Sequence, residues 1–243
     1  MLSGAGAMIV REAGSTLILI TQPDHAALAR RIMERWTDED LVRSPRRRDI
    51  LHAVEHHDDG WIDVDRAPIV DDATGALLNF ITAPIAVRQG IWPRGVGLLA
   101  SRPYAAALVA QHALHVYRRY REEPAWSAFF AEMESLRAHH LRGAEPATLD
   151  VLLSDYRWLR AGDILSLAFC NGWSEVQHDE RGGSAHLLGD RLVLTPDPFG
   201  GAAVPLAVPG RELPNAPFAS PAAAEHAYAG APATTLTGVA AGA

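Results

Sequence analysis

The chain has 243 residues, of which 48% are hydrophobic and 21% are charged, and its formal net charge at pH 7 is −7. This length and composition suit one globular domain with a sizeable core, while the negative charge argues against a general role on nucleic acids or membrane surfaces. The sequence has no lysine and one cysteine, Cys170. Schiff-base lysine chemistry, an intramolecular disulfide and a cysteine-rich zinc site are therefore excluded.

The two ends of the chain differ in composition from its middle. Residues 1–7 are small and Gly-rich, so we predict a disordered leader followed by a single domain over residues 8–243. No charged leader with an apolar stretch and no apolar run of membrane-spanning length is visible, so we expect a cytoplasmic protein. From about residue 215 the sequence is rich in Ala, Pro and Gly. We predict one short helix there, near 221–229, followed by fraying.

Helical patterns dominate the middle of the chain. After a strand or hairpin within residues 8–21, the apolar periodicity predicts helices from Pro23 and over about 47–58, 84–100, 103–121, 124–141 and 146–170, with a kink or break at Pro93. These helices make a core over about 22–172. Two β-type runs, 186–195 and 203–208, predict a β segment over about 184–210 that pairs with the N-terminal strand. The predicted fold is therefore mainly α, with a small β appendage formed by the N- and C-terminal strands.

Four polar residues fall on apolar faces of the predicted helices: His25, His57, Asp58 and Asp163. Asp163 lies on the apolar stripe of the last long helix, where an unpaired carboxylate is very costly and must find a partner. The adjacent His57 and Asp58 offer a nitrogen and an oxygen donor at a helix end. A set of two His and two Asp suits a divalent ion such as Mn, Fe, Co or Zn. We predict a metal site from these residues, and one ion is favoured over two. A single inward histidine is, however, more often a hydrogen-bonded core residue.

Two further residues are candidates for catalysis. Asp59 follows the predicted ligand pair and could act as a general base or orient a water molecule, and the alternative is a loop residue that bonds backbone amides. His112 faces inward, because it lies four residues after Leu108 and four before Val116. It is also a candidate fifth metal ligand.

These motifs support a resemblance at two levels. The order His, His-Asp, Asp on helices is similar to the ligand order of the HD metal-dependent phosphohydrolase superfamily. More closely, the chain resembles an uncharacterised bacterial family known as domain of unknown function 3891, over nearly its whole length from Met8. The matching segments are Met8–Arg11, Gln22–His25, His57–Trp61, Leu78–Phe80, Asp163–Leu167 and Pro196–Phe199. The two-metal members of the HD superfamily have two more histidines before the last Asp, and here Asn79-Phe80 stands roughly where one of them is expected.

The HD resemblance implies an HD-domain-like helical bundle and a metal-dependent hydrolase that acts on a small phosphorylated molecule. Two alternatives are open: a non-haem iron oxygenase on the same scaffold, and a non-catalytic module that binds a metal or a metabolite. We expect a small-molecule substrate as the partner, with no nucleic acid and no membrane, and a homodimer is left open.

Overall fold

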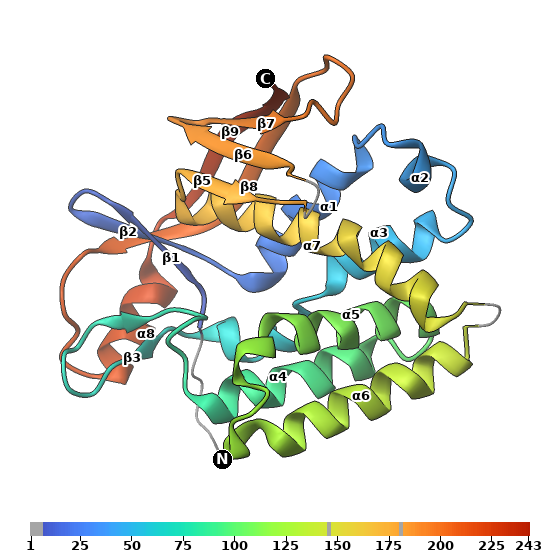
Figure 1. Cartoon of the computed structure of the whole chain (residues 1–243). Coiled ribbons are helices and arrows are strands. Elements are labelled where there is room, and N and C mark those ends of the chain that lie inside the picture. Colours follow the sequence, from blue (N-terminus) through green and yellow to red (C-terminus); the bar gives the residue numbers. More distant parts are fainter. Residues whose placement is uncertain (1–6, 145–146, 180–181) are drawn as a thin grey trace.

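The computed structural model describes residues 7–144, 147–179 and 182–243. These residues form two neighbouring bodies: a curled seven-stranded sheet and a group of packed helices (Figure 1). The protein is thus a mixed α/β fold. The prediction of a mainly α, HD-domain-like bundle with a small β appendage is wrong, because the sheet is a complete layer of the fold.

The helices lie close to their predicted positions, since apolar periodicity is a local property of the sequence. Three begin next to a proline in the first turn, where its missing N–H costs nothing. α4 continues through Pro93, where the sequence predicted a kink or break. The helices are α1 (Gln22–Glu34), α2 (Glu39–Val42), α3 (Arg47–His56), α4 (Ile85–Leu98), α5 (Pro103–Val116), α6 (Ser127–Arg142), α7 (Leu149–Asn171) and α8 (Pro221–Gly230), with 3-10 turns η1 (Asp59–Trp61), η2 (Val64–Arg66), η3 (Arg118–Tyr120) and η4 (Pro124–Trp126).

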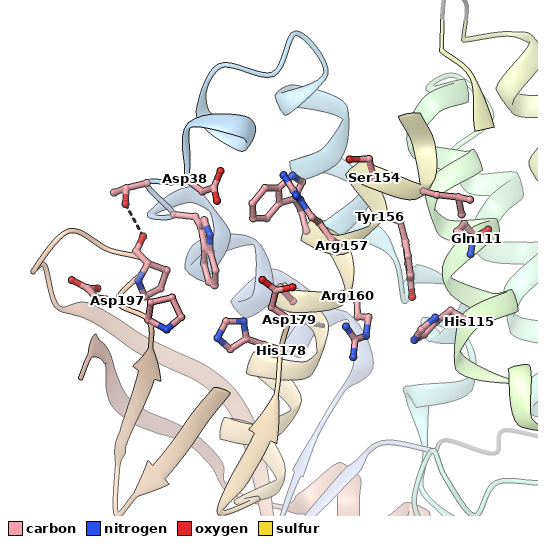
Figure 2. A pocket seen from close by; sticks show the side chains of 17 residues that line it. Asp38, Gln111, His115, Ser154, Tyr156, Arg157, Arg160, His178, Asp179 and Asp197 are labelled. Atoms are coloured by element: carbon pink, nitrogen blue, oxygen red, sulfur yellow. Dashed lines mark hydrogen bonds between the residues drawn. The ribbon is translucent and has the colours of Figure 1, made fainter. Parts of the chain in front are cut away.

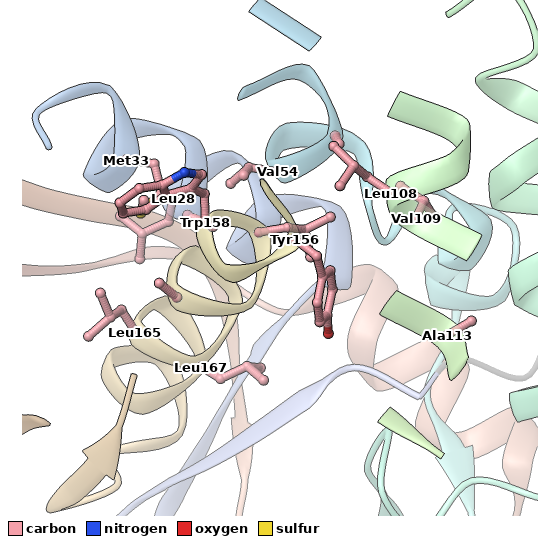
Figure 3. Close-up of a cluster of buried hydrophobic side chains, with 14 of the residues drawn as sticks. Leu28, Met33, Val54, Leu108, Val109, Ala113, Tyr156, Trp158, Leu165 and Leu167 are labelled. Atoms are coloured by element: carbon pink, nitrogen blue, oxygen red, sulfur yellow. The ribbon is translucent and has the colours of Figure 1, made fainter. Parts of the chain in front are cut away.

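The long helix α7 organises the core, because it packs against α1, α3 and α5 (Figure 3). Large apolar side chains from these helices, such as Leu28 and Leu165, are fully buried between them. Gly162 allows α7 to approach closely: a Cβ atom there would lie 2.9 Å from Met33 Cγ and 3.0 Å from Val54 Cγ1. The same packing holds four helices at fixed positions around one point of the interior, which is where the polar residues meet.

The sheet has the strand order β1-β2-β8-β9-β7-β6-β5. Each neighbouring pair is antiparallel except β7 and β9, which run parallel. Both chain ends contribute, since β2 pairs with β8, as the sequence predicted. The strands are β1 (Ile9–Ala13), β2 (Thr16–Ile20), β5 (Glu175–Gln177), β6 (Ser184–Leu188), β7 (Arg191–Thr195), β8 (Val204–Pro214) and β9 (Ala233–Gly242), and a separate small pair joins β3 (Ile69–Val70) to β4 (Leu77–Leu78).

The strand β9 explains why the sheet exceeds the prediction. Its sequence was expected to fray after the short helix, yet it pairs with β8 on one side and β7 on the other. Small residues are required here: a Cβ atom on Gly238 would lie 2.2 Å from the Asp190 carbonyl oxygen. β8 tolerates Pro205 and Pro209 because β2 pairs only with its far end, Arg211–Pro214, so no bond to β2 is lost.

Some predictions fall at the edges of the described chain. Residues 1–6 of the predicted disordered leader lie outside the described residues, whereas Ala7 is buried and its carbonyl accepts a hydrogen bond from the Gln22 side chain at 3.1 Å. Pro146, the predicted start of the last long helix, also lies outside them. Within the described ranges, every helix is too short or too polar to cross a lipid bilayer.

Candidate metal centre

The first predicted ligand, His25, lies in the first turn of α1. Thr21 caps this helix, because its hydroxyl oxygen accepts a hydrogen bond from the Asp24 amide at 3.2 Å. Pro23 then fixes the first helical turn. The His25 side chain points away from solvent and is fully buried. A histidine rather than an apolar residue at this inward position needs polar partners in the interior.

His57 and Asp58 directly follow α3, at the point where the chain turns sharply into η1. Gly60 makes this turn possible: a Cβ atom there would lie 2.0 Å from the carbonyl oxygen of Ile91 in α4. The turn directs His57, 1% exposed, and Asp58, 7% exposed, into the interior toward α1. The Gly of the segment His57-Asp58-Asp59-Gly60 is thus needed for close packing of the backbone.

Five residues meet at this point, from three helices and from the turn that follows α3, and we call them the His–Asp cluster: His25, His57, Asp58, His112 and Asp163. The distance from Asp58 Oδ2 is 2.8 Å to His25 Nε2 and 3.5 Å to His57 Nε2. Asp163 lies on the other side, with Oδ1 at 3.4 Å from His57 Nε2 and Oδ2 at 3.5 Å from His112 Nε2. His57 Nε2 therefore lies between the carboxylates of Asp58 and Asp163. The two triads that share His57 each place three ligand atoms within 4.8 Å of one another.

Each of the three imidazoles is held by its other nitrogen. His57 Nδ1 donates to the Val54 carbonyl oxygen at 2.8 Å, and His112 Nδ1 lies 2.9 Å from the Tyr156 hydroxyl. His25 Nδ1 lies 2.9 Å from Ser166 Oγ. These outer contacts orient the rings so that all three Nε2 atoms face the two carboxylates, which is the arrangement that histidine ligands of metal ions adopt.

The hydrogen bonds also fix which nitrogen carries the proton. A carbonyl oxygen can only accept, so His57 Nδ1 is protonated. The Ser166 hydroxyl donates to the Asp163 carbonyl oxygen at 2.9 Å, so its oxygen accepts from His25 Nδ1. When these rings are neutral, each Nε2 therefore presents a lone pair to the cluster. His57 Nε2 is buried, and the described residues give it no hydrogen-bond partner. The donor set thus fits a cation that this nitrogen would bind.

Burial and neighbouring charges shift the pKa of three members of the cluster. Burial alone would lower the pKa of His57, but the carboxylates of Asp58 and Asp163 outweigh it and raise the pKa above the ordinary histidine value. Burial would likewise raise the pKa of Asp163, yet the close contact with His57 and the charges of the nearby imidazoles hold it below its usual range. For His112, burial dominates and lowers the pKa to about 4, so this ring is neutral at pH 7. The two carboxylates would attract a divalent ion, which would displace the proton that His57 holds at pH 7 in the metal-free protein.

Comparison with known proteins places the chain in a family. The model of the family described as "Protein of unknown function (DUF3891)" matches residues 8–215. The chain belongs to this family. No curated protein and no solved structure matches it. The family resemblance seen in the sequence is therefore confirmed, whereas the comparisons do not show the relation to the HD superfamily.

The structure separates the two candidate catalytic residues of this DUF3891 protein. His112 is 3% exposed and belongs to the cluster as a fifth donor, so its geometry suits a ligand better than an acid or a base. Asp59 is directed elsewhere: its Oδ2 lies 2.8 Å from His56 Nδ1, on the outer side of α3. Ser166 and Tyr156 were not predicted to contribute. Ser166 lies three residues after Asp163 and Tyr156 lies seven before it. This helical spacing places both on the same face of α7 as Asp163 and could have indicated their role.

A cavity of about 600 Å³ lies beside the cluster, between α7, α5 and the end of the sheet (Figure 2). Tyr156 forms part of its wall, and the hydroxyl of this residue contacts His112 of the cluster. Arg157, Arg160 and His178 also line the cavity. Tyr156, Arg160 and Asp163 share one face of α7, because they are spaced by four and three residues. The cavity and the cluster therefore follow the same side of one helix.

Proposed function

We propose that the protein is a metal-dependent hydrolase that acts on a small phosphorylated molecule. The observation that carries this proposal is the buried His57 Nε2, which lies between two carboxylates without a hydrogen-bond partner among the described residues. A buried polar atom without a partner is rare in native proteins and calls for an explanation. A divalent cation supplies one, because it would bind this nitrogen and neutralise Asp58 and Asp163 together.

The donor set selects the class of ion. Three imidazole nitrogens and two carboxylates suit Mn, Fe, Co or Zn, whereas Mg and Ca favour oxygen donors alone. Such an ion supplies Lewis acidity, which activates water and polarises a phosphoryl oxygen. Three helices and the turn that follows α3 hold the five donors in place, so that little reorganisation is needed on binding.

The cavity would receive the substrate. Arg160 and Arg157 bring two permanent positive charges to its wall, which suits a phosphate group, although Arg157 also forms an ion pair with Asp40 at 2.7 Å. The carboxylates of Asp38 and Asp197 also line the cavity, but each accepts hydrogen bonds from backbone amides, at 2.6–2.9 Å. A third carboxylate, Asp179, follows His178 directly and suits a substrate that also carries hydrogen-bond donors.

His178 supports a binding role for this cavity. The residue is 4% exposed, and neither of its ring nitrogens has a hydrogen-bond partner within the described chain. It lies edge-to-face against Trp36, with ring centroids 5.6 Å apart, which holds the imidazole at the cavity wall (Figure 2). Both ring nitrogens are shielded from solvent in this structure, so His178 would bond a hydroxyl or a phosphate oxygen of the substrate once its ring turned toward the cavity.

Metal analysis tests the proposal first, with hydrolysis of phosphoesters as a second readout. We expect the purified wild-type chain to retain a divalent ion, and Asp163→Asn to lose it with little change in side-chain volume. With the ion at 100 times its Kd, binding adds about 2.7 kcal/mol of stability, or roughly 5–11 °C in Tm for a chain of this size. Asp163→Asn should lose this shift, whereas the control His139→Asn, on the exposed side of α6, should keep it.

The outcomes separate the three functions. Phosphoester hydrolysis that depends on the ion supports the hydrolase. Iron with a colour that changes on reduction, without hydrolysis, would instead favour the oxygenase. A bound ion without either activity would favour a binding module. No ion and no Tm shift with Mn, Fe, Co or Zn would contradict the metal centre itself.

A further inference from the structure

A second group of metal-binding side chains lies on the outer face of α3. His52, Glu55 and His56 are each partly exposed, and one ligand atom from each lies within 4.8 Å of the other two. The two histidines are one helical turn apart, with ring centroids separated by 4.3 Å. Side chains four residues apart on a helix are neighbours, so this pair needs no tertiary contact to converge on one ion.

His56 is oriented as a metal ligand by a residue outside the triad. Asp59 Oδ2 lies 2.8 Å from His56 Nδ1, so this nitrogen carries the proton and donates it to the carboxylate. The remaining ring atom, His56 Nε2, lies 3.5 Å from Glu55 Oε2. A carboxylate that holds one nitrogen of a histidine while the other faces further donors is the usual second-sphere arrangement of zinc sites. Asp59, predicted to act at the buried site, has this contact instead.

We propose that His52, Glu55 and His56 bind a second ion, Zn²⁺, at the protein surface and separately from the His–Asp cluster. Two imidazoles and one carboxylate are a donor set that zinc accepts, and a fourth, open position is left for water. Two nitrogen donors disfavour Mg²⁺ and Ca²⁺. Because only three protein ligands contribute and all are partly exposed, the ion would exchange with the medium.

Arg30 limits the affinity of this site. Its NH1 donates to Glu55 Oε2 at 2.9 Å, and its Nε donates to Glu34 at 2.7 Å. The guanidinium therefore competes with the ion for the Glu55 carboxylate and repels it by charge. Removal of Arg30 is expected to strengthen zinc binding. If His52, Glu55 and His56 had only a structural role, removal of Arg30 would not be expected to strengthen zinc binding.

The proposed surface site lies next to the residues of the buried His–Asp cluster that follow α3. His56 and His57 are consecutive, and they point to opposite sides of the last turn of α3: His57 is 1% exposed and faces the core, while His56 is partly exposed. An ion that joins His52 to His56 would fix this turn, from which His57 and Asp58 extend. Zinc at the surface is therefore expected to stabilise the end of α3.

Zinc competition with a chromophoric chelator tests the proposal on the full, chelator-stripped chain. We expect Asp163→Asn, which disables the buried cluster, still to bind one Zn²⁺, and the added pair His52→Gln and His56→Gln to abolish this binding. His52→Gln alone should weaken it at least tenfold, and Arg30→Gln should strengthen it. The matched control is His186→Gln, since His186, in β6, lies 4.0 Å from a carboxylate, Glu175, but belongs to none of the groups of three ligands among the described residues.

Because the Asp163→Asn background isolates the surface site, the result does not depend on the proposed hydrolase. Circular dichroism melts of each variant show whether it is folded, and Gln is a good helix former at these partly exposed positions. Zinc affinity that is unchanged in His52→Gln, or lowered equally by His186→Gln, would overturn the proposal. So would Arg30→Gln that binds zinc more weakly than the parent.

Discussion

The buried carboxylate of Asp65 is expected to make the protein less stable as the pH rises. Asp65, in η2, is 6% exposed, and its Oδ2 accepts a hydrogen bond from the Gln22 amide at 2.6 Å, at the start of α1. Its Oδ1 is buried and has no hydrogen-bond partner in the described structure. Burial raises the pKa of Asp65 from 3.8 to about 7, although the Gln22 hydrogen bond opposes this rise.

The sign and size of the effect follow from the linkage between protonation and folding. Between pH 3.8 and about 7 the folded chain binds more protons at Asp65 than the unfolded chain does. The stability that this proton contributes is therefore complete below the unfolded pKa and is lost as the pH rises through the folded pKa. Between pH 5 and pH 8 the loss is about 2.5 kcal/mol, or roughly 5–10 °C in Tm.

Urea unfolding at several pH values, from 5 to 8, measures this loss in the parent and in Asp65→Asn. The difference in slope isolates Asp65, because other titrating groups contribute equally to both chains and a fixed change in hydrogen bonding does not depend on pH. The control is Asp63→Asn, since Asp63 is two residues away and its side chain is 60% exposed. Equal slopes in the parent and in Asp65→Asn would refute the reasoning.

Three further predictions concern backbone packing beside the cluster, one outer contact of the cluster, and a separate hydrogen-bond network at Asp155. Gly60→Ala places a Cβ atom 2.0 Å from the Ile91 carbonyl oxygen, so it should cost about 1–3 kcal/mol in thermal unfolding and lower the metal content, and a variant with parental Tm and metal content would contradict this. Ser166→Ala removes the acceptor of His25 Nδ1 and should weaken metal binding about 10–100-fold by calorimetry, with Ser154→Ala on the same helix as the control. Asp155→Ala breaks hydrogen bonds from Arg46 at 2.7 Å and Tyr104 at 2.6 Å, and we expect a loss of about 2 kcal/mol because Arg46 keeps some contact with water. A loss below about 0.5 kcal/mol in denaturant unfolding would show that this network contributes little to stability.

Local sequence patterns were sufficient to predict the longer helices and the inward direction of the polar residues, whereas the short helix α2 was not predicted. His25, His57 and Asp163 were placed on apolar faces by their spacing from neighbouring apolar residues, and the structure buries both histidines and brings all three into one cluster. Helical periodicity is determined by residues within one or two turns, so a single sequence contains it. The short helix near residues 221–229 was predicted from the composition of the tail and corresponds to α8.

The size of the sheet was decided only by the tertiary structure. β9 is made of small residues whose pattern resembles that of a frayed tail, and its stability comes from backbone pairing with β8 and β7, which are distant in the sequence. The direction of Asp59 could not be predicted either, because a residue just after a helix can turn to either side. Periodicity shows which residues face the interior, but it does not show which residues of other elements meet them there. That depends on how the helices pack, and the packing also creates the outer contacts of Ser166 and Tyr156 and the cavity beside them.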